Sequence, residues 1–357
     1  MLNENIFFCN YSIGENVYQE VPKVCRIFGR RILLIGGQKA MEAGRTRLEQ
    51  AVKGSGLKIV DAVWYGKDCT ASNIEKLAEH ARTMGVDMIF GMGGGKALDT
   101  AKGAADEAGL PVFTFPTIAA TCAATTALSV VYREDGSFER FWFYDRPAVH
   151  CFIDLTLIAN APAQYLQAGM GDTIGKFFEC HFSARGDKLA HASGLGREIS
   201  NMCYEPLLVH GVQALKDCEE HRCSEDLKEA VLANIVSTGL VSLMVLDEYN
   251  CAVAHSVYYG MVLLPGYEED NLHGNGVANG VLVQLAVDAD LEEARRLKAF
   301  LQQLKIRTTL REMNIPLDRG YLKEMLRETV TGPDMEHIPY TVTEDMIFEA
   351  MKVVEEL

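Results

Sequence analysis

Basic residues are scarce in this chain of 357 residues. Lysine and arginine number 34 against 49 aspartates and glutamates, so the formal net charge is −15. A protein that binds the phosphate backbone of nucleic acid needs a basic face, and this balance argues against that class of partner. The start of the chain also lacks the basic segment that opens a secretory signal. We therefore expect a cytoplasmic protein that binds no nucleic acid.

Long apolar runs and paired cysteines are missing as well. A membrane-spanning helix needs about 20 apolar residues, and the best candidate, 239–257, is interrupted by Asp247 and Glu248. The ten cysteines are scattered without a Cys-x-x-Cys pair, which argues against a disulfide framework or a zinc knuckle. We expect no membrane contact and reduced, mostly buried thiols.

Strand-like and helix-like segments alternate through the first part of the chain, which predicts a parallel sheet covered by helices. A tight hairpin turn is expected at Asp135-Gly136. The expected strands are 31–35, 57–65, 86–90, 112–115, 129–132, 138–144 and 149–153, and the expected helices are 38–53, 73–83 and 97–107.

Helical periodicity takes over after residue 160. Apolar residues recur at the helical spacing in 227–246, 291–304 and 343–354, and strand signals nearly vanish. The length of the chain also favours two domains over one. The sequence predicts an α/β domain with a Rossmann-like parallel sheet over 1–160 and an all-α domain over 161–357.

A glycine-rich segment, 91–102, follows an apolar strand and opens a helix. Such a turn can hold a pyrophosphate, because glycine lets the backbone approach the ligand and a helix N-terminus favours negative charge. The spacing is not that of an ATP-binding P-loop, since the first glycine would fall on Phe90 and Ala97 replaces the hydroxyl residue. It also differs from G-x-G-x-x-G. The segment indicates dinucleotide binding, with a purely structural turn as the alternative.

Three residues of the second part are candidate metal ligands: Asp172, His255 and His273. One carboxylate and two imidazoles suit zinc or ferrous iron. A glycine-flanked aspartate can equally cap a helix, and a single histidine can be a core or surface residue. Spacing along the chain leaves both interpretations open, because only the fold can bring the three side chains together.

Taken together, several ordered segments resemble glycerol dehydrogenase and its relatives in the iron-containing alcohol dehydrogenase superfamily, which includes glycerol-1-phosphate dehydrogenases and dehydroquinate synthases. The resemblance covers nearly the whole chain. It implies a dinucleotide-binding α/β domain, a helical domain, and a divalent metal in the cleft between them, held by Asp172, His255 and His273. The matching segments are 93–102, 116–119, 126–132, 168–172, the surroundings of His255 and His273, and 280–285.

The resemblance also implies a cofactor and its contacts. It points to NAD, with NADP open, to a small alcohol or carbonyl substrate, and to a homo-oligomer. Zinc is favoured over iron, because the iron-dependent enzymes typically add a histidine one turn after the metal aspartate, where this chain has Lys176. The implied cofactor-binding residues are Gly37, Gly93, Gly94, Gly95, Lys96, Asp99, Thr117, Ala120, Thr126, Leu128 and Tyr132.

Three positions depart from the glycerol dehydrogenase pattern. Gly37 stands where an aspartate would bond the ribose hydroxyls and repel a 2′-phosphate, so NADP stays open. Cys122 replaces an aspartate beside the polyol, which argues against glycerol itself, because a thiol is a weak acceptor. Lys176 resembles the glycerol-1-phosphate dehydrogenase version of its segment. It can meet a substrate phosphate or carboxylate, or lower the pKa of a bound alcohol. Alternatively it neutralises Asp172 or reaches solvent, and both readings stay open.

These inferences predict a metal-dependent, NAD(P)-linked oxidoreductase that interconverts a small polyol or alcohol and its ketone or aldehyde. The candidate catalytic residues are Asp172, His255 and His273, acting through the metal, together with Cys122 and Lys176. Three alternatives remain: a glycerol-1-phosphate dehydrogenase-like activity on a phosphorylated substrate, a dehydroquinate synthase-like lyase, and a non-catalytic cofactor-binding protein.

Overall fold

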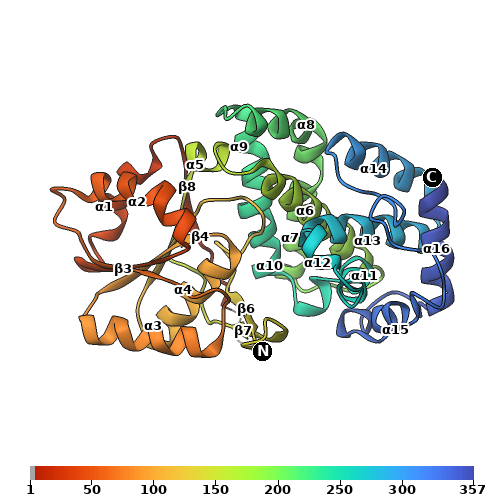
Figure 1. Ribbon diagram of the computed structural model, residues 1–357, viewed down its shortest axis with the longest axis horizontal. Helices are drawn as coiled ribbons and strands as arrows, with labels where there is room; N and C mark the ends of the chain where they lie inside the picture. The colour runs from red at the N-terminus through yellow and green to blue at the C-terminus, as the bar shows by residue number, and fades with distance from the viewer. Residues whose placement is uncertain (1–4) are drawn as a thin grey trace. The chain divides into compact units, whose positions relative to one another are not determined.

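The computed structural model of the chain describes residues 5–357 and divides into two compact units. Among the described residues, the first comprises 5–162 and Asp217–Val231, and the second comprises Ala163–Lys216 and Leu232–Leu357. Figure 1 follows the chain from the red and orange strands of the first unit to the green and blue helices of the second. The segment Asp217–Val231 has the helical periodicity of the second part of the chain but packs with the first unit.

A six-stranded sheet, parallel throughout, forms the centre of the first unit. This confirms the predicted fold class. The edge strand β1 was not predicted, because Asn10–Gly14 is polar and half-exposed and so lacks an apolar signal. In spatial order the strands are β1 (Asn10–Gly14), β8 (His150–Asp154), β5 (Val112–Pro116), β4 (Met88–Gly93), β2 (Arg31–Gly36) and β3 (Lys58–Trp64).

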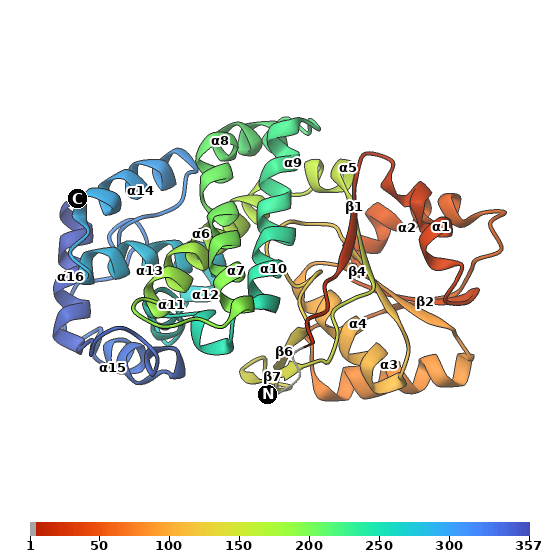
Figure 2. The same cartoon turned by 180° about the vertical axis from the view of Figure 1, so that it is seen from behind.

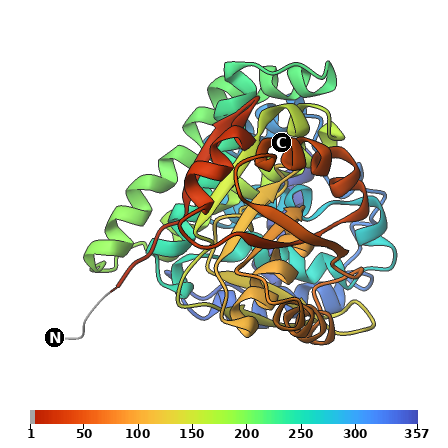
Figure 3. The same cartoon turned by 90° about the vertical axis from the view of Figure 1, so that its left-hand side faces the viewer.

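Helices cover both faces of this sheet, as its run of apolar strand residues requires. Ile32 and Leu34 of β2 face α1 (Val21–Cys25) and α2 (Gln38–Val52). The alternate residues of β2 face α3 (Ala71–Met84) and α4 (Gly95–Ala108). Figure 3 views this unit from its own end, with the red helices on one side of the sheet and the orange helices on the other. All of the strands and helices predicted up to residue 115 are confirmed within a few residues.

A separate hairpin joins β6 (Leu128–Tyr132) to β7 (Phe138–Phe143) in antiparallel register. Its turn contains Gly136 at φ 88°, which confirms the predicted hairpin. The hairpin is tied to α4, because the Val130 amide donates to Asp99 Oδ2 at 3.1 Å and the Ser129 hydroxyl donates to the Asp99 carbonyl at 3.0 Å.

The remaining helices follow β8. Within residues 5–357, one apolar run, Glu225–Met244, is long enough to cross a membrane, but 61% of it is buried inside the structure, as in a core helix. Figure 2 shows the last three helices of the chain, with the C-terminus at α16. The helices are α5 (Leu155–Ala159), α6 (Ala163–Ser183), α7 (His191–Ile199), α8 (Glu205–Glu219), α9 (Glu225–Leu232), α10 (Thr238–Met244), α11 (Val253–Val262), α12 (Tyr267–Asp270), α13 (His273–Val287), α14 (Leu291–Gln303), α15 (Lys323–Thr331) and α16 (Glu344–Glu356).

Glycines let α6, α11 and α13 approach backbone to backbone. A Cβ atom on Gly274 would lie 1.7 Å from the Ala168 carbonyl oxygen and 2.9 Å from the Asp172 nitrogen. A Cβ atom on Gly280 would lie 2.2 Å from the Ala254 carbonyl oxygen. Neither position can accept a side chain without separating the helices. This close packing positions Asp172 of α6 beside the first turn of α13.

We predict that Gly274→Ala separates α6 from α13 and destabilises the protein by at least about 2 kcal/mol, because a backbone carbonyl cannot yield to the added methyl group. Gly194→Ala in α7 is the matched control: a Cβ atom there meets nothing within 4 Å, so the variant should be as stable as the wild type or slightly more stable. Thermal unfolding followed by circular dichroism measures both. Equal melting temperatures for the two variants would contradict this account of the packing.

Candidate active site

Three helices of the second unit bring the predicted metal ligands together. Asp172 lies in the middle of α6, His255 in the first turn of α11, and His273 is the first residue of α13. Asp172 Oδ1 lies 3.6 Å from His255 Nε2 and 3.3 Å from His273 Nε2. The side chains of Asp172 and His255 are 13% and 8% exposed, whereas that of His273 is 37% exposed. The cluster is therefore buried on two sides and open beside His273.

This geometry fits a divalent metal ion. Two ligand atoms that each bind one zinc ion at about 2.1 Å lie roughly 3.4 Å apart in a tetrahedral site. The ligand atoms of the three residues all lie within 4.8 Å of one another, and two of the separations come close to that value. Among residues 5–357, this is the one group of three or more metal-ligating side chains with such spacing. A carboxylate and two imidazoles leave room in the coordination sphere for a further ligand.

Close contacts with neighbouring side chains shift the pKa values of Asp172 and His255. Burial alone would raise the pKa of Asp172, but its contacts with His255 and His273 hold that pKa well below the usual range. Burial likewise disfavours a charged ring at His255, but Cys251, Glu179 and Asp172 together raise its pKa well above the ordinary value. The raised pKa favours the protonated ring of His255, so a metal ion competes with a proton for this ligand.

Neighbouring side chains complete this end of α6 and α11. Lys176 follows Asp172 by one turn and is 8% exposed, and its Nζ donates to the Asn250 carbonyl oxygen at 2.8 Å and to Asn250 Oδ1 at 3.0 Å. The Tyr258 ring packs edge-on against His273, with the ring centroids 4.4 Å apart. Asp334 lies in the 3₁₀ turn Pro333–Met335, where burial raises its pKa to about 6.

Sequence reasoning missed Glu179. It is fully buried in α6 and lies two turns after Asp172, so both residues share one face of the helix. Its Oε2 lies 2.5 Å from His255 Nδ1. The available signal was its spacing: an acidic residue seven positions after a proposed ligand lies on the same face of a helix. Cys251 and Asp334 were missed too, because their elements become neighbours of α6 only in the fold.

In the first unit, the carboxyl ends of β2, β4 and β5 meet at the glycine turn. The Gly37 amide donates to the Met92 carbonyl and the Thr117 amide to the Gly93 carbonyl, each at 3.1 Å. Gly93 has φ 150°, and a Cβ atom there would lie 2.8 Å from the Ala97 side chain, so this turn requires glycine. Helix α4 begins after Gly94 with no side-chain cap. Its first amides and its dipole form the kind of site that binds a pyrophosphate.

Two ion pairs next to this turn involve predicted cofactor residues, Lys96 and Asp99. Lys96 pairs with Asp68 and lies 4.6 Å from the centre of the Tyr132 ring. Asp99 pairs with the buried Lys102 at 3.0 Å, and Lys102 also donates to Thr126 Oγ1 at 3.2 Å and to the Leu128 carbonyl. The carboxylate of Asp99 thus supports the β6–β7 hairpin behind the turn.

Ala120 and Cys122 lie in the loop between β5 and β6, both half-buried. The Thr125 amide donates to the Cys122 carbonyl at 2.9 Å, which closes a turn at this loop. The loop belongs to the first unit, whereas the three metal-ligand candidates and Lys176 belong to the second.

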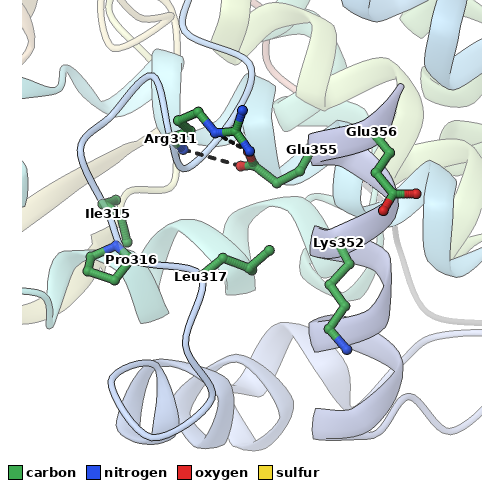
Figure 4. A pocket seen from close by; sticks show the side chains of 7 residues that line it. All are labelled: Arg311, Ile315, Pro316, Leu317, Lys352, Glu355 and Glu356. Carbon is green, nitrogen blue, oxygen red and sulfur yellow. Dashed lines mark hydrogen bonds and ion pairs between the residues drawn. The ribbon is translucent and has the colours of Figure 1, made fainter.

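A surface hollow of about 450 Å³ lies elsewhere in the second unit, where Arg311 pairs with Glu355 across its upper edge (Figure 4). None of the predicted site residues lines it, so this hollow is not the predicted reaction site. Its lining consists of Arg311, Ile315, Pro316, Leu317, Lys352, Glu355 and Glu356.

Comparison with known proteins identifies the family of the chain. Residues 9–151 match the family model for iron-containing alcohol dehydrogenase. Hydroxycarboxylate dehydrogenase A from Escherichia coli K12 is 33% identical over 330 residues, covering 91% of this chain and 89% of that protein. Glycerol dehydrogenase from Escherichia coli O6:H1 is 29% identical over 353 residues, covering 97% and 95%. The crystal structure of glycerol dehydrogenase from Schizosaccharomyces pombe has a TM-score of 0.90 at 25% identity, covering 100% of this chain and 91% of that one.

The chain belongs to the iron-containing alcohol dehydrogenase family. The resemblance inferred from the sequence is confirmed, and so is the class of reaction: the protein is a metal-dependent, NAD-linked oxidoreductase of alcohols or polyols.

We predict that the affinity of the metal-free protein for zinc falls as the pH falls. The raised pKa of His255 means that the metal must displace a proton, which costs up to about tenfold in affinity per pH unit for one proton. Competition titrations with a chelating indicator between about pH 8 and about pH 6 measure this dependence. A zinc affinity that does not change over that interval would show that His255 is already neutral.

Proposed function

We propose that this member of the iron-containing alcohol dehydrogenase family uses zinc at Asp172, His255 and His273. The enzyme would interconvert a small alcohol and its carbonyl form, and the alcohol would carry a second oxygen next to the reacting carbon. The single observation behind the proposal is the three-residue cluster, buried on two sides and open beside His273. Three protein ligands leave coordination positions for a substrate with neighbouring oxygens. Relatives named glycerol dehydrogenase and hydroxycarboxylate dehydrogenase A support substrates of this size.

Glycerol itself is not the substrate that we favour. Cys122 is half-buried in the loop between β5 and β6, and a thiol accepts hydrogen bonds from a polyol much more weakly than a carboxylate does. The two open readings of Lys176 bear on the same choice. A phosphate or carboxylate on the substrate would be attracted by the charge of this buried ammonium. Otherwise Lys176 only offsets the charge of Asp172, one turn away.

Separate groups of residues would bind the metal and the cofactor during the reaction. When bound, a divalent metal would provide Lewis-acid stabilisation of negative charge on the substrate oxygen, and a nicotinamide cofactor would provide the hydride chemistry. Asp172, His255 and His273 would hold the metal, and the edge-on contact of Tyr258 restrains the His273 ring. The uncapped first turn of α4 offers amides to the pyrophosphate, and the Asp99–Lys102 pair holds the hairpin beside it.

The adenosine end of the cofactor site carries no acid at its expected position. Gly37 precedes α2, and Gln38 and Lys39 follow it. Without a carboxylate at the end of β2, nothing at that position repels a 2′-phosphate. We therefore propose that the protein accepts NADP as well as NAD.

Two further properties are part of the proposal. The ten cysteines lie outside any disulfide and most are buried, which supports a reducing, cytoplasmic location. Three aromatic side chains of β7, Phe138, Phe141 and Phe143, are each about half exposed, and such clusters favour association between copies of the chain. We expect a homo-oligomer.

The proposed function is tested by oxidation of NADH and NADPH with hydroxyketones, aldehydes, 2-oxo acids and their phosphorylated counterparts, after chelation and again after addition of zinc or ferrous iron. We expect turnover that depends on added metal. Asp172→Ala and His255→Ala should each lose both metal content and more than about 100-fold of the turnover, because the loss of a Lewis acid removes several kcal/mol of transition-state stabilisation. Full activity in either variant, or in the chelated wild type, would refute the proposal.

We predict that Gly37→Asp raises the KM for NADPH by about tenfold or more, because the new carboxylate repels the 2′-phosphate, with little effect on NADH. The substitution fits, since a Cβ atom on Gly37 meets its nearest atoms, in Ala40 and Tyr65, at 3.7 Å. Gly37→Asn, equal in size but uncharged, is the control and should keep the wild-type preference. If both variants change alike, the effect is steric and the charge argument fails.

A further inference from the structure

Glu179 makes three short contacts that all end on the first turn of α11. Its Oε1 accepts hydrogen bonds from the Ala252 amide at 2.7 Å and the His255 amide at 2.8 Å. Its Oε2 lies 2.5 Å from His255 Nδ1. The side chain is completely buried. The carboxylate of Glu179 therefore contacts both the backbone amide and the ring of His255, whose Nε2 lies near Asp172.

The two backbone contacts replace a missing helix cap. Helix α11 has Ala252 at its N-cap position and no side-chain cap of its own. The first amides of a buried helix need acceptors, and one carboxylate oxygen of Glu179 accepts two hydrogen bonds there. This contact fixes the height of the His255 backbone relative to α6.

The contact with the ring decides which nitrogen can bind a metal. A buried carboxylate accepts a hydrogen bond from Nδ1–H, so the ring carries its proton on Nδ1 when it is neutral. The lone pair then lies on Nε2, which is the atom 3.6 Å from Asp172 Oδ1.

We propose that Glu179 is a positioning residue of the metal site. It holds the imidazole of His255 in the Nδ1–H tautomer and aims Nε2 at the metal, and in this way it raises the affinity for the metal. This inference rests on the proposed metal site at Asp172, His255 and His273. It adds a residue that contacts neither metal nor substrate and acts through His255.

A purely structural role as the cap of α11 is the competing explanation, and Glu179→Gln separates the two. The amide oxygen of glutamine can keep both backbone contacts. Its NH₂ group then faces His255 Nδ1 as a donor, which favours the Nε2–H tautomer that cannot bind the metal. A capping role predicts little change in metal affinity, and a positioning role predicts a large loss.

Glu312→Gln is the matched control. Glu312 is also a carboxylate of the second unit that caps backbone amides, since its Oε2 accepts hydrogen bonds from the Thr308 amide at 2.6 Å and the Thr309 amide at 3.2 Å. It is not among the residues of the metal-ligand cluster. Any general effect of replacing a capping carboxylate by an amide should appear equally in this variant.

The experiment is calorimetric titration of zinc into the metal-free wild type and both variants, with the absorption spectrum of the cobalt-substituted proteins as a second readout. We expect Glu179→Gln to bind zinc about 10- to 100-fold more weakly, with an altered cobalt spectrum, and Glu312→Gln to match the wild type. Equal zinc affinities in Glu179→Gln and the wild type would overturn the inference. A wild type that binds neither ion would overturn the metal site itself, and the role of Glu179 with it.

A measurement on the wild type keeps the inference testable if Glu179→Gln does not fold. In the zinc-loaded protein labelled with ¹⁵N-histidine, two-bond proton–nitrogen correlations report which ring nitrogen carries the proton. We expect the His255 ring to carry it on Nδ1. A proton on Nε2, with the metal on Nδ1, would overturn the inference.

Discussion

The close approach of α13 to α6 and to α11 is the constraint on which the active site depends. Glycines at the crossing points let the backbones touch, so that Asp172, in the middle of one helix, lies beside the first turns of two others. Ligand atoms on three different helices can stay within a few tenths of an ångström of a metal-binding geometry only if the helices cannot slide. Backbone-to-backbone contact provides that rigidity, since it contains no flexible side chain.

Several buried charged groups around the site are paired with polar or charged neighbours. Asp172 is compensated by two imidazoles, and Glu179 by the ring and amides of the first turn of α11. The Lys176 ammonium donates hydrogen bonds to the carbonyl oxygen and to Oδ1 of Asn250. In the first unit, the buried pair of Asp99 and Lys102 links α4 to the neighbouring hairpin. In each unit, the predicted site residues therefore lie next to buried, paired charges. Burying such charges costs free energy of desolvation, but the completed network holds the side chains in fixed positions.

Sequence patterns anticipated the parallel sheet well, because alternating strands and helices with glycine stops leave few other topologies. The edge strand β1 was missed, since Asn10–Gly14 has no apolar signal and forms a strand only by pairing with β8. The sequence identified Asp172 and the two histidines as candidate metal ligands, but their spacing along the chain did not show that they lie close together. Glu179 was overlooked because a buried carboxylate and a solvent-exposed one look the same in a sequence.

The sequence by itself determined the class of fold, the glycine turn after β4 and the family, because these depend on local periodicity and on short segments of fixed order. Only the tertiary structure decided that Asp172, His255 and His273 meet, that Glu179 fixes the His255 ring, and that Asp99 supports a hairpin. Those facts depend on which faces of distant helices pack together. Packing is set by the shapes of many side chains and by the absence of others, as at Gly274, and no single segment of the chain encodes it.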